Sequence, residues 1–172
     1  EEINIEPPRH ALFPRDYSVT QPTAEYVARD LVAAQLRGDR PSLLKAPEYA
    51  LELAENLINQ KCSGGSFITL TTRELTRGDL IGKRAIKNHV WQDVLNKMQA
   101  NDIIPIIIRE TDSAHSPNLF KNVVEGPEAS IHLPLRMALY EKALLNFSKN
   151  NGPASLLIYG NVNGIIFNHI DN

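Results

Sequence analysis

The apolar spacing across residues 86–98 constrains the fold of this chain more than any other feature of its sequence. Six apolar side chains fall within one half of a helical wheel, namely Ile86, Val90, Trp91, Val94, Leu95 and Met98. This spacing is typical of an amphipathic helix that buries one face. We expect the helix to run to about Ala100, after a break at Gly78 with Asp79 as a candidate N-cap.

Shorter elements are predicted on both sides of this helix. Thr71 and Glu74 have the T-x-x-E spacing of a capping box, which predicts a short helix from Thr71 that ends at Gly78. Upstream, the alternation in "SFITL" predicts a strand, and "APEYALELAENLINQ" predicts a helix with Pro47 in its first turn. Downstream, "DIIPIII" predicts a strand, in which Pro105 lacks a donor and so favours an edge position.

The two ends of the chain supply the remaining elements. Residues 1–21 hold three prolines and predict an extended arm, followed by a helix from Thr23 to about Arg37 that stops at Gly38. After a polar loop at 110–128, "ASIHLPL" predicts a strand. The segment "LPLRMALYEKALLNFSKN" predicts a helix whose two apolar faces indicate burial between layers or a homodimer contact, and "SLLIYGNVNGIIFNHI" predicts a β-hairpin.

The order of these elements resembles the winged helix-turn-helix superfamily over about residues 46–135. The sequence thus predicts an α+β, mainly helical fold class: a winged helix-turn-helix core with an N-terminal arm and helix and a C-terminal helix plus β-hairpin. After the arm at 1–21, residues 22–172 are expected to form one globular domain. The resemblance implies that the long helix enters the major groove of DNA and that the strand–loop–strand segment forms the wing.

Positive charge is concentrated in the segment that resembles the helix-turn-helix. The whole chain of 172 residues carries a net charge of −2. Residues 61–100, however, carry seven Lys/Arg and three Asp/Glu, a net charge of +4. A local basic patch matters more for phosphate contact than the charge of the whole chain, although a solvated helical face would have the same composition.

The polar side of the long helix supplies candidate base-reading residues. Asn88 and Gln92 can pair with adenine edges, and Arg84 can pair with guanine or phosphate. Lys87 falls inside the apolar arc, so its side chain must extend to solvent or the helix begins later. The full set of predicted DNA-binding residues is Thr72, Arg73, Lys83, Arg84, Lys87, Asn88, His89, Gln92, Arg109, His115 and Lys121.

The sequence contains no strong catalytic or metal-binding motif. Its five histidines are scattered without ligand spacing, and no Gly-x-Ser-x-Gly, P-loop or Gly-x-Gly-x-x-Gly string occurs. Cys62 is the only cysteine, which excludes an internal disulfide and a zinc site built from cysteines. We therefore expect a protein that is not an enzyme and needs no cofactor or metal.

The expected function is sequence-specific binding of double-stranded DNA, by a transcriptional regulator or by the DNA-recognition domain of a replication or mobile-element protein. The alternative is a protein–protein adaptor or assembly module on the same helical scaffold, and a small-molecule-sensing domain is a third reading. No apolar run approaches the roughly 20 residues of a membrane span, and the single cysteine favours a reducing compartment. We expect a cytoplasmic protein with no membrane partner.

Overall fold

The computed structural model describes residues 33, 36–38, 44–74, 88–149, 152–160 and 162–167. The chain divides into two compact units, Glu1–Pro41 and Ser42–Asn172. In the first unit, Ala33 and Leu36 are helical and Gly38 follows with a φ of 83°. A left-handed glycine is a common helix stop, in agreement with the helix end predicted at Gly38. The predicted arm at 1–21 lies outside the described residues.

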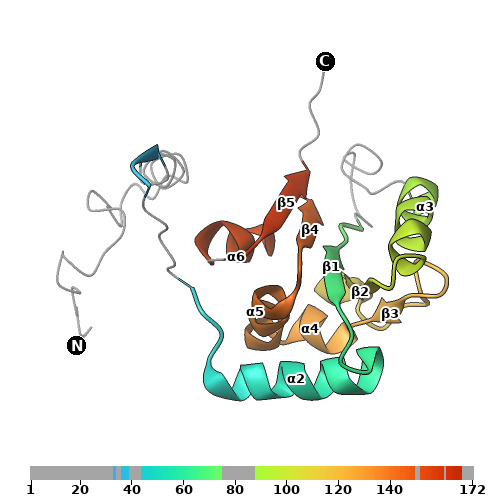
Figure 1. The fold of residues 1–172 in the computed structure, drawn as a ribbon, viewed down its shortest axis with the longest axis horizontal. Coiled ribbons are helices and arrows are strands. Elements are labelled where there is room, and N and C mark those ends of the chain that lie inside the picture. The colour runs from blue at the N-terminus through green and yellow to red at the C-terminus, as the bar shows by residue number, and fades with distance from the viewer. Residues whose placement is uncertain are drawn as a thin grey trace, which may run out of the picture. The chain divides into compact units, whose positions relative to one another are not determined.

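A parallel sheet of five described strands forms the centre of the second unit, in the order β3-β2-β1-β4-β5 (Figure 1). The strands are β1 (Phe67–Thr71), β2 (Ile104–Ile108), β3 (Val124–Glu125), β4 (Asn146–Lys149) and β5 (Gly164–Phe167). Each neighbouring pair is parallel. Parallel neighbours need crossover connections, which place helices on the faces of the sheet.

Helices cover the two faces unequally. The helices of this unit are α2 (Glu48–Cys62), α3 (Asn88–Gln99), α4 (Pro127–Ile131), α5 (Leu133–Lys142) and α6 (Ala154–Tyr159), with a 3₁₀ turn, η2, at Thr111–Ser113. Residues of α2, α4, α5 and α6 pack with Phe67, Ile106 and Ile108 on one face. On the other face, α3 packs on Ile68, Leu70 and Ile107. Figure 1 shows α3 across the sheet from α5 and α6.

The predicted winged helix-turn-helix fold is wrong, because the unit is an α/β fold with a parallel sheet rather than a mainly helical one. The predicted wing needs antiparallel strands at "DIIPIII" and "ASIHLPL", whereas β2 pairs in parallel with β1 and β3, and "ASIHLPL" lies in α4 and α5. All five residues of β1 are buried, as are the last four of β2. Strands that are buried on both faces have nearly continuous apolar sequences. Such a sequence does not by itself show whether the strand pairs in parallel or antiparallel with its neighbours.

Pro105 lies in an interior strand, so its predicted edge position is also wrong. β2 stands between β1 and β3, and Pro105 is opposite Ile68. Ile104 donates its N–H to Ser66 of the β1 side at 3.0 Å. Because successive N–H groups point to opposite sides of a strand, the nitrogen of Pro105 faces the β3 side. The pairing with β3 begins only at Ile106, so no ladder bond is lost.

The predicted capping box is wrong as well, because Thr71 is the last residue of β1. Its hydroxyl lies 2.5 Å from the Tyr140 hydroxyl, and the Glu74 carboxylate pairs with Arg109. Residues 75–87, which include the expected helix end at Gly78, lie outside the described residues. The helices at α2 and α3 and the strand at β1 are confirmed, with the ends of α2 and β1 and the C-terminal end of α3 close to the predicted ones. The predicted start of the α3 helix near Asp79 lies outside the described residues.

The C-terminal third differs most from the prediction. Residues 127–131 form α4 with Pro127 in its first turn, and the His132 side chain accepts the Leu135 N–H at the start of α5, so "ASIHLPL" is not a strand. The helix predicted over 133–150 ends at Lys142 and is followed by β4. The predicted hairpin is α6 followed by β5, and β5 is parallel to β4.

None of the described helices combines the length and the apolar character that crossing a lipid bilayer requires.

Candidate functional site at the carboxyl edge of the sheet

The order of the strands creates a topological switch point between β1 and β4. From β1 the chain proceeds to β2 and β3 on one side, and it returns to β4 and β5 on the other side of β1. The connection that leaves β1 leads to α3 on one face, whereas β4 leads to α6 on the other. In open parallel sheets, ligands bind outside the carboxyl ends of the strands where the connections diverge in this way.

Polar and charged residues gather at this carboxyl edge. Thr71 and Ser148 lie opposite each other near the ends of β1 and β4, and both are buried. The residues that follow are Thr72, Arg73 and Glu74 after β1, Arg109 and Glu110 after β2, and Lys149 at the end of β4. The edge therefore presents hydroxyl groups and both signs of charge around the switch point.

A nearly buried ion pair joins the ends of β1 and β2. The Arg109 Nε donates to Glu74 Oε1 at 2.8 Å, and its Nη2 donates to Glu74 Oε2. The Arg109 Nη1 donates to the carbonyls of Ser116 and Pro117 at 2.9 and 2.8 Å. The two side chains are only 6% and 17% exposed. The bond to Glu74 raises the pKa of Arg109, so this pair is a fixed, charged support for the edge.

Two further carboxyl groups nearby are held in surroundings that disfavour their charge. Burial raises the pKa of Glu110, although its carboxylate accepts the Glu74 N–H at 3.0 Å. Burial also raises the pKa of Glu125, against the attraction of Arg109. Glu125 Oε1 is buried and has no hydrogen-bond partner. Removal of the charge from either group should therefore favour the folded state.

We expect the free energy of unfolding to fall as the pH rises through the raised pKa values of Glu110 and Glu125. A carboxyl group whose pKa is higher in the folded than in the unfolded chain contributes stability that is complete below its unfolded pKa of about 4.3 and is lost above its folded pKa. Replacing Glu125 with glutamine should flatten this fall and increase stability at pH 7. Urea unfolding of both proteins between pH 4 and 8 measures the effect, and parallel curves for the two proteins would contradict it.

Buried hydrogen bonds run along the β1–β4 boundary behind the edge. The Thr69 hydroxyl donates to Asn146 Oδ1 at 2.6 Å, and Asn146 Nδ2 donates to the Tyr140 carbonyl at 3.0 Å. The Tyr140 hydroxyl then contacts Thr71, and burial raises the pKa of Tyr140. These bonds hold the carboxyl end of β1 against α5 and β4.

Arg136 secures the same region from α5. It is 3% exposed, and it donates to the carbonyls of Ala129 at 2.8 Å, Ser130 at 3.0 Å and Arg109 at 3.3 Å. Burial lowers the pKa of Arg136. Two of these carbonyls belong to the last turn of α4, whose negative dipole end favours a cation. Arg136 thus fixes α4 and the end of β2 rather than facing solvent.

The structure brings some of the predicted DNA-binding residues together and separates others. Thr72 and Arg109 both bond to Glu74 at the carboxyl edge, and Arg73 lies near Glu110. Gln92 exchanges two bonds with the backbone of Lys121 at 2.8 and 3.1 Å. Three others, Asn88, His89 and His115, are exposed, whereas Lys83, Arg84 and Lys87 lie outside the described residues.

The sequence interpretation missed the contributions of Glu74, Glu110 and Lys149. A repeated pattern could have indicated the first two: the apolar runs of β1 and β2 are each followed by Arg-Glu, at Arg73-Glu74 and Arg109-Glu110. Charged residues directly after buried runs are typical of the carboxyl ends of parallel strands. No local pattern distinguishes Lys149, because the predicted helix included it.

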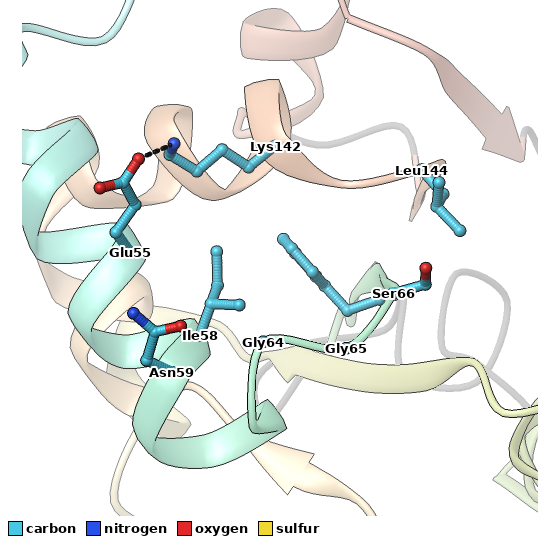
Figure 2. A pocket seen from close by; sticks show the side chains of 9 residues that line it. Glu55, Ile58, Asn59, Gly64, Gly65, Ser66, Lys142 and Leu144 are labelled. Carbon is cyan, nitrogen blue, oxygen red and sulfur yellow. Dashed lines mark hydrogen bonds and ion pairs between the residues drawn. The ribbon is translucent and has the colours of Figure 1, made fainter.

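The opposite, amino edge of the sheet holds an open pocket of about 340 Å³. Figure 2 shows Ile58 pointing into it, with Lys142 paired to Glu55 at 2.7 Å on its rim. The charged groups of this pocket already neutralise each other, so its chemistry is less specific than that of the carboxyl edge. Cys62 is buried nearby, and burial raises the pKa of its thiol.

Among the described residues, no three His, Cys, Asp or Glu side chains are arranged to hold a metal ion. Comparisons of the chain with protein-family models, with curated proteins and with solved structures found no match.

Proposed function

We propose that this protein binds a small anionic ligand, of the phosphate-bearing class, at the switch point between β1 and β4. The single observation that carries the proposal is the strand order, since ligands of open parallel sheets bind at this place. Arg73 and Lys149 supply one cation from each flanking strand. Thr72 and Ser148 directly precede these two cations in the sequence, and their hydroxyl groups donate to Glu74 and to the Lys149 carbonyl.

The distribution of charge supports an anion rather than a cation as the ligand. Residues 75–87 connect β1 to α3 and carry Arg77, Lys83, Arg84 and Lys87 against Asp79 alone. Arg109 is already neutralised by Glu74, so it adds no net charge. Lys149 has no carboxylate partner among the described residues, which leaves its charge available to a ligand. Glu110 offsets Arg73 at the same edge, so the positive excess that favours an anion comes from residues 75–87.

Titration with inorganic phosphate and pyrophosphate, followed by amide chemical shifts, tests the proposal. We expect the amides of Thr72 and Lys149 to shift, and Lys149→Gln to weaken binding about tenfold, the usual worth of one charge-assisted contact. Lys97→Gln is the matched control. This substitution removes the same charge, but from the last turn of α3, away from the carboxyl edge. Equal affinity in the two variants, or shifts elsewhere, would overturn the site.

Duplex DNA is a second candidate ligand, favoured by the net charge of +4 on residues 61–100. The fold is not a winged helix, and the Gln92 amide forms hydrogen bonds with the backbone of Lys121. If the basic segment contacts the DNA backbone, replacing Lys83 and Arg84 with alanine should reduce the slope of log affinity against log salt by about two units. An unchanged slope in the folded double variant would exclude this reading.

A further inference from the structure

Among the described residues, no helix covers part of the sheet face that adjoins the proposed anion site. On the α3 side, α3 is the helix that packs against the sheet among the described residues, and it covers β1, β2 and, through Trp91, part of β4 and β5. Ile165 and Phe167 of β5 are 43% and 37% exposed, and Val90 of α3 is 48% exposed. Parallel sheets normally have both faces covered, and contiguous exposed apolar side chains mark binding surfaces.

Three aromatic rings pack together at this area, and Phe167 is the exposed one among them. Phe147 and Phe167, on β4 and β5, are stacked with ring centroids 6.1 Å apart and planes 12° apart. Trp91 meets both rings edge-on, with centroids 5.9 Å from Phe147 and 5.4 Å from Phe167. Edge-on contacts of this kind hold ring planes in place. Phe167 is therefore an oriented ring that is partly accessible to solvent.

A basic residue is the strand partner of Phe167. Lys149 pairs in register with Phe167, so the two residues lie side by side at the carboxyl ends of β4 and β5. Both Lys149 and Phe147 are on β4, two residues apart, and therefore share one face. The aromatic surface thus adjoins the cation assigned above to the anionic group of the ligand.

We infer that the ligand carries a planar aromatic ring of the nucleobase type, which packs against Phe167 while its phosphate group lies at Lys149. A flat ring matches an oriented aromatic side chain, and stacking on such side chains is how proteins hold bases without reading their sequence. An aliphatic ligand would gain apolar contact with Phe167 but no stacking on its ring. The inference depends on the proposed anion site for the phosphate group only.

Titrations with adenosine monophosphate, adenosine and inorganic phosphate test the inference, with the fluorescence of Trp91 and amide shifts as readouts. Trp91 is the only tryptophan of the chain, and it contacts Phe167. We expect adenosine monophosphate to quench Trp91 and to bind at least tenfold more tightly than phosphate, since one stacked base contributes about this factor. The ring could belong to a free nucleotide or to single-stranded nucleic acid, and an adenosine oligonucleotide distinguishes the two. Tighter binding of the oligonucleotide than of the mononucleotide indicates single-stranded nucleic acid.

Phe167→Leu separates ring stacking from apolar contact. This substitution should weaken the binding of adenosine monophosphate about tenfold and leave the affinity for phosphate unchanged. Tyr49→Leu is the matched control, because Tyr49 is an exposed aromatic residue of α2, which packs on the other face. If phosphate binds but the nucleoside adds no affinity, the ring inference falls and the proposed function stands. If adenosine binds through Phe167 and phosphate does not bind, the ring inference stands and the proposed anion site falls.

Discussion

Replacing Arg136 with methionine should lower the free energy of unfolding by about 3–5 kcal/mol, since a hydrogen bond from a charged donor contributes about 1.5–3 kcal/mol. The guanidinium is almost fully buried and donates to three carbonyls, at Ala129, Ser130 and Arg109. Methionine has a similar length and no donor, so the carbonyls of Ala129 and Arg109 would lose this donor, whereas the Ser130 carbonyl keeps the Thr111 hydroxyl. Urea unfolding followed by far-UV circular dichroism measures the loss.

Arg136→Lys is the informative control for this prediction. Lysine keeps the positive charge near the end of α4 but cannot reach carbonyls on two sides with a planar fork. We expect the free energy of unfolding of the lysine variant to lie between those of the wild type and the methionine variant. If methionine costs less than about 1 kcal/mol, in the range of ordinary surface substitutions, then Arg136 does not hold α4 to the end of β2.

Removing the carboxylate of Glu74 is expected to have an effect of similar size. Glu74→Ala leaves the Arg109 guanidinium with two carbonyl partners and without its paired carboxylate, in a place where its side chain is 6% exposed. Breaking a buried ion pair from one side costs about 3–5 kcal/mol. We also expect the amides of Thr72 and Arg73 to shift, because Glu74 fixes the chain that follows β1.

A double-mutant cycle with Arg109→Met isolates the pair itself. The coupling free energy should be about 2–3 kcal/mol, at the upper end for residues in direct contact. The ion pair between Glu55 and Lys142 gives a control within the same chain, because its side chains are 61% and 27% exposed. Glu55→Ala should cost less than about 1 kcal/mol, as is usual for surface pairs. Similar losses at Glu74 and Glu55 would show that burial does not strengthen the pair at the edge.

The helices α2 and α3 could be predicted because burial repeats along them with helical spacing. Ala50, Ala54 and Leu57 of α2 are buried, as expected, and Leu95 is buried at the centre of the apolar face of α3. Leu53 has the same helical spacing as these residues of α2 in the sequence, but it is half exposed. These faces are local properties of the sequence, so tertiary contacts alter only their margins.

The direction of the strands could not be predicted, because it depends on segments far apart in the chain. The apolar run of β2 fits an antiparallel wing and a buried parallel strand equally well. Only its neighbours, β1 and β3, distinguish the two. The same limit applies to the site: Thr71 has the spacing of a helix cap, but its partner is Tyr140, 69 residues away. A local pattern cannot report such a contact.

The central place of β1 in the sheet also determines when this unit can be completed during synthesis. Its β2 neighbour follows within one crossover, but the other neighbour is β4, and the hydroxyl of Thr69 bonds to Asn146, 77 residues later. While the ribosome adds the intervening residues, one side of β1 has no strand to pair with. Parallel pairing over long separations is slow and exposes unpaired strand edges. We expect nascent chains that end before β4 to depend on chaperones, and this dependence to cease once β4 has left the ribosomal tunnel.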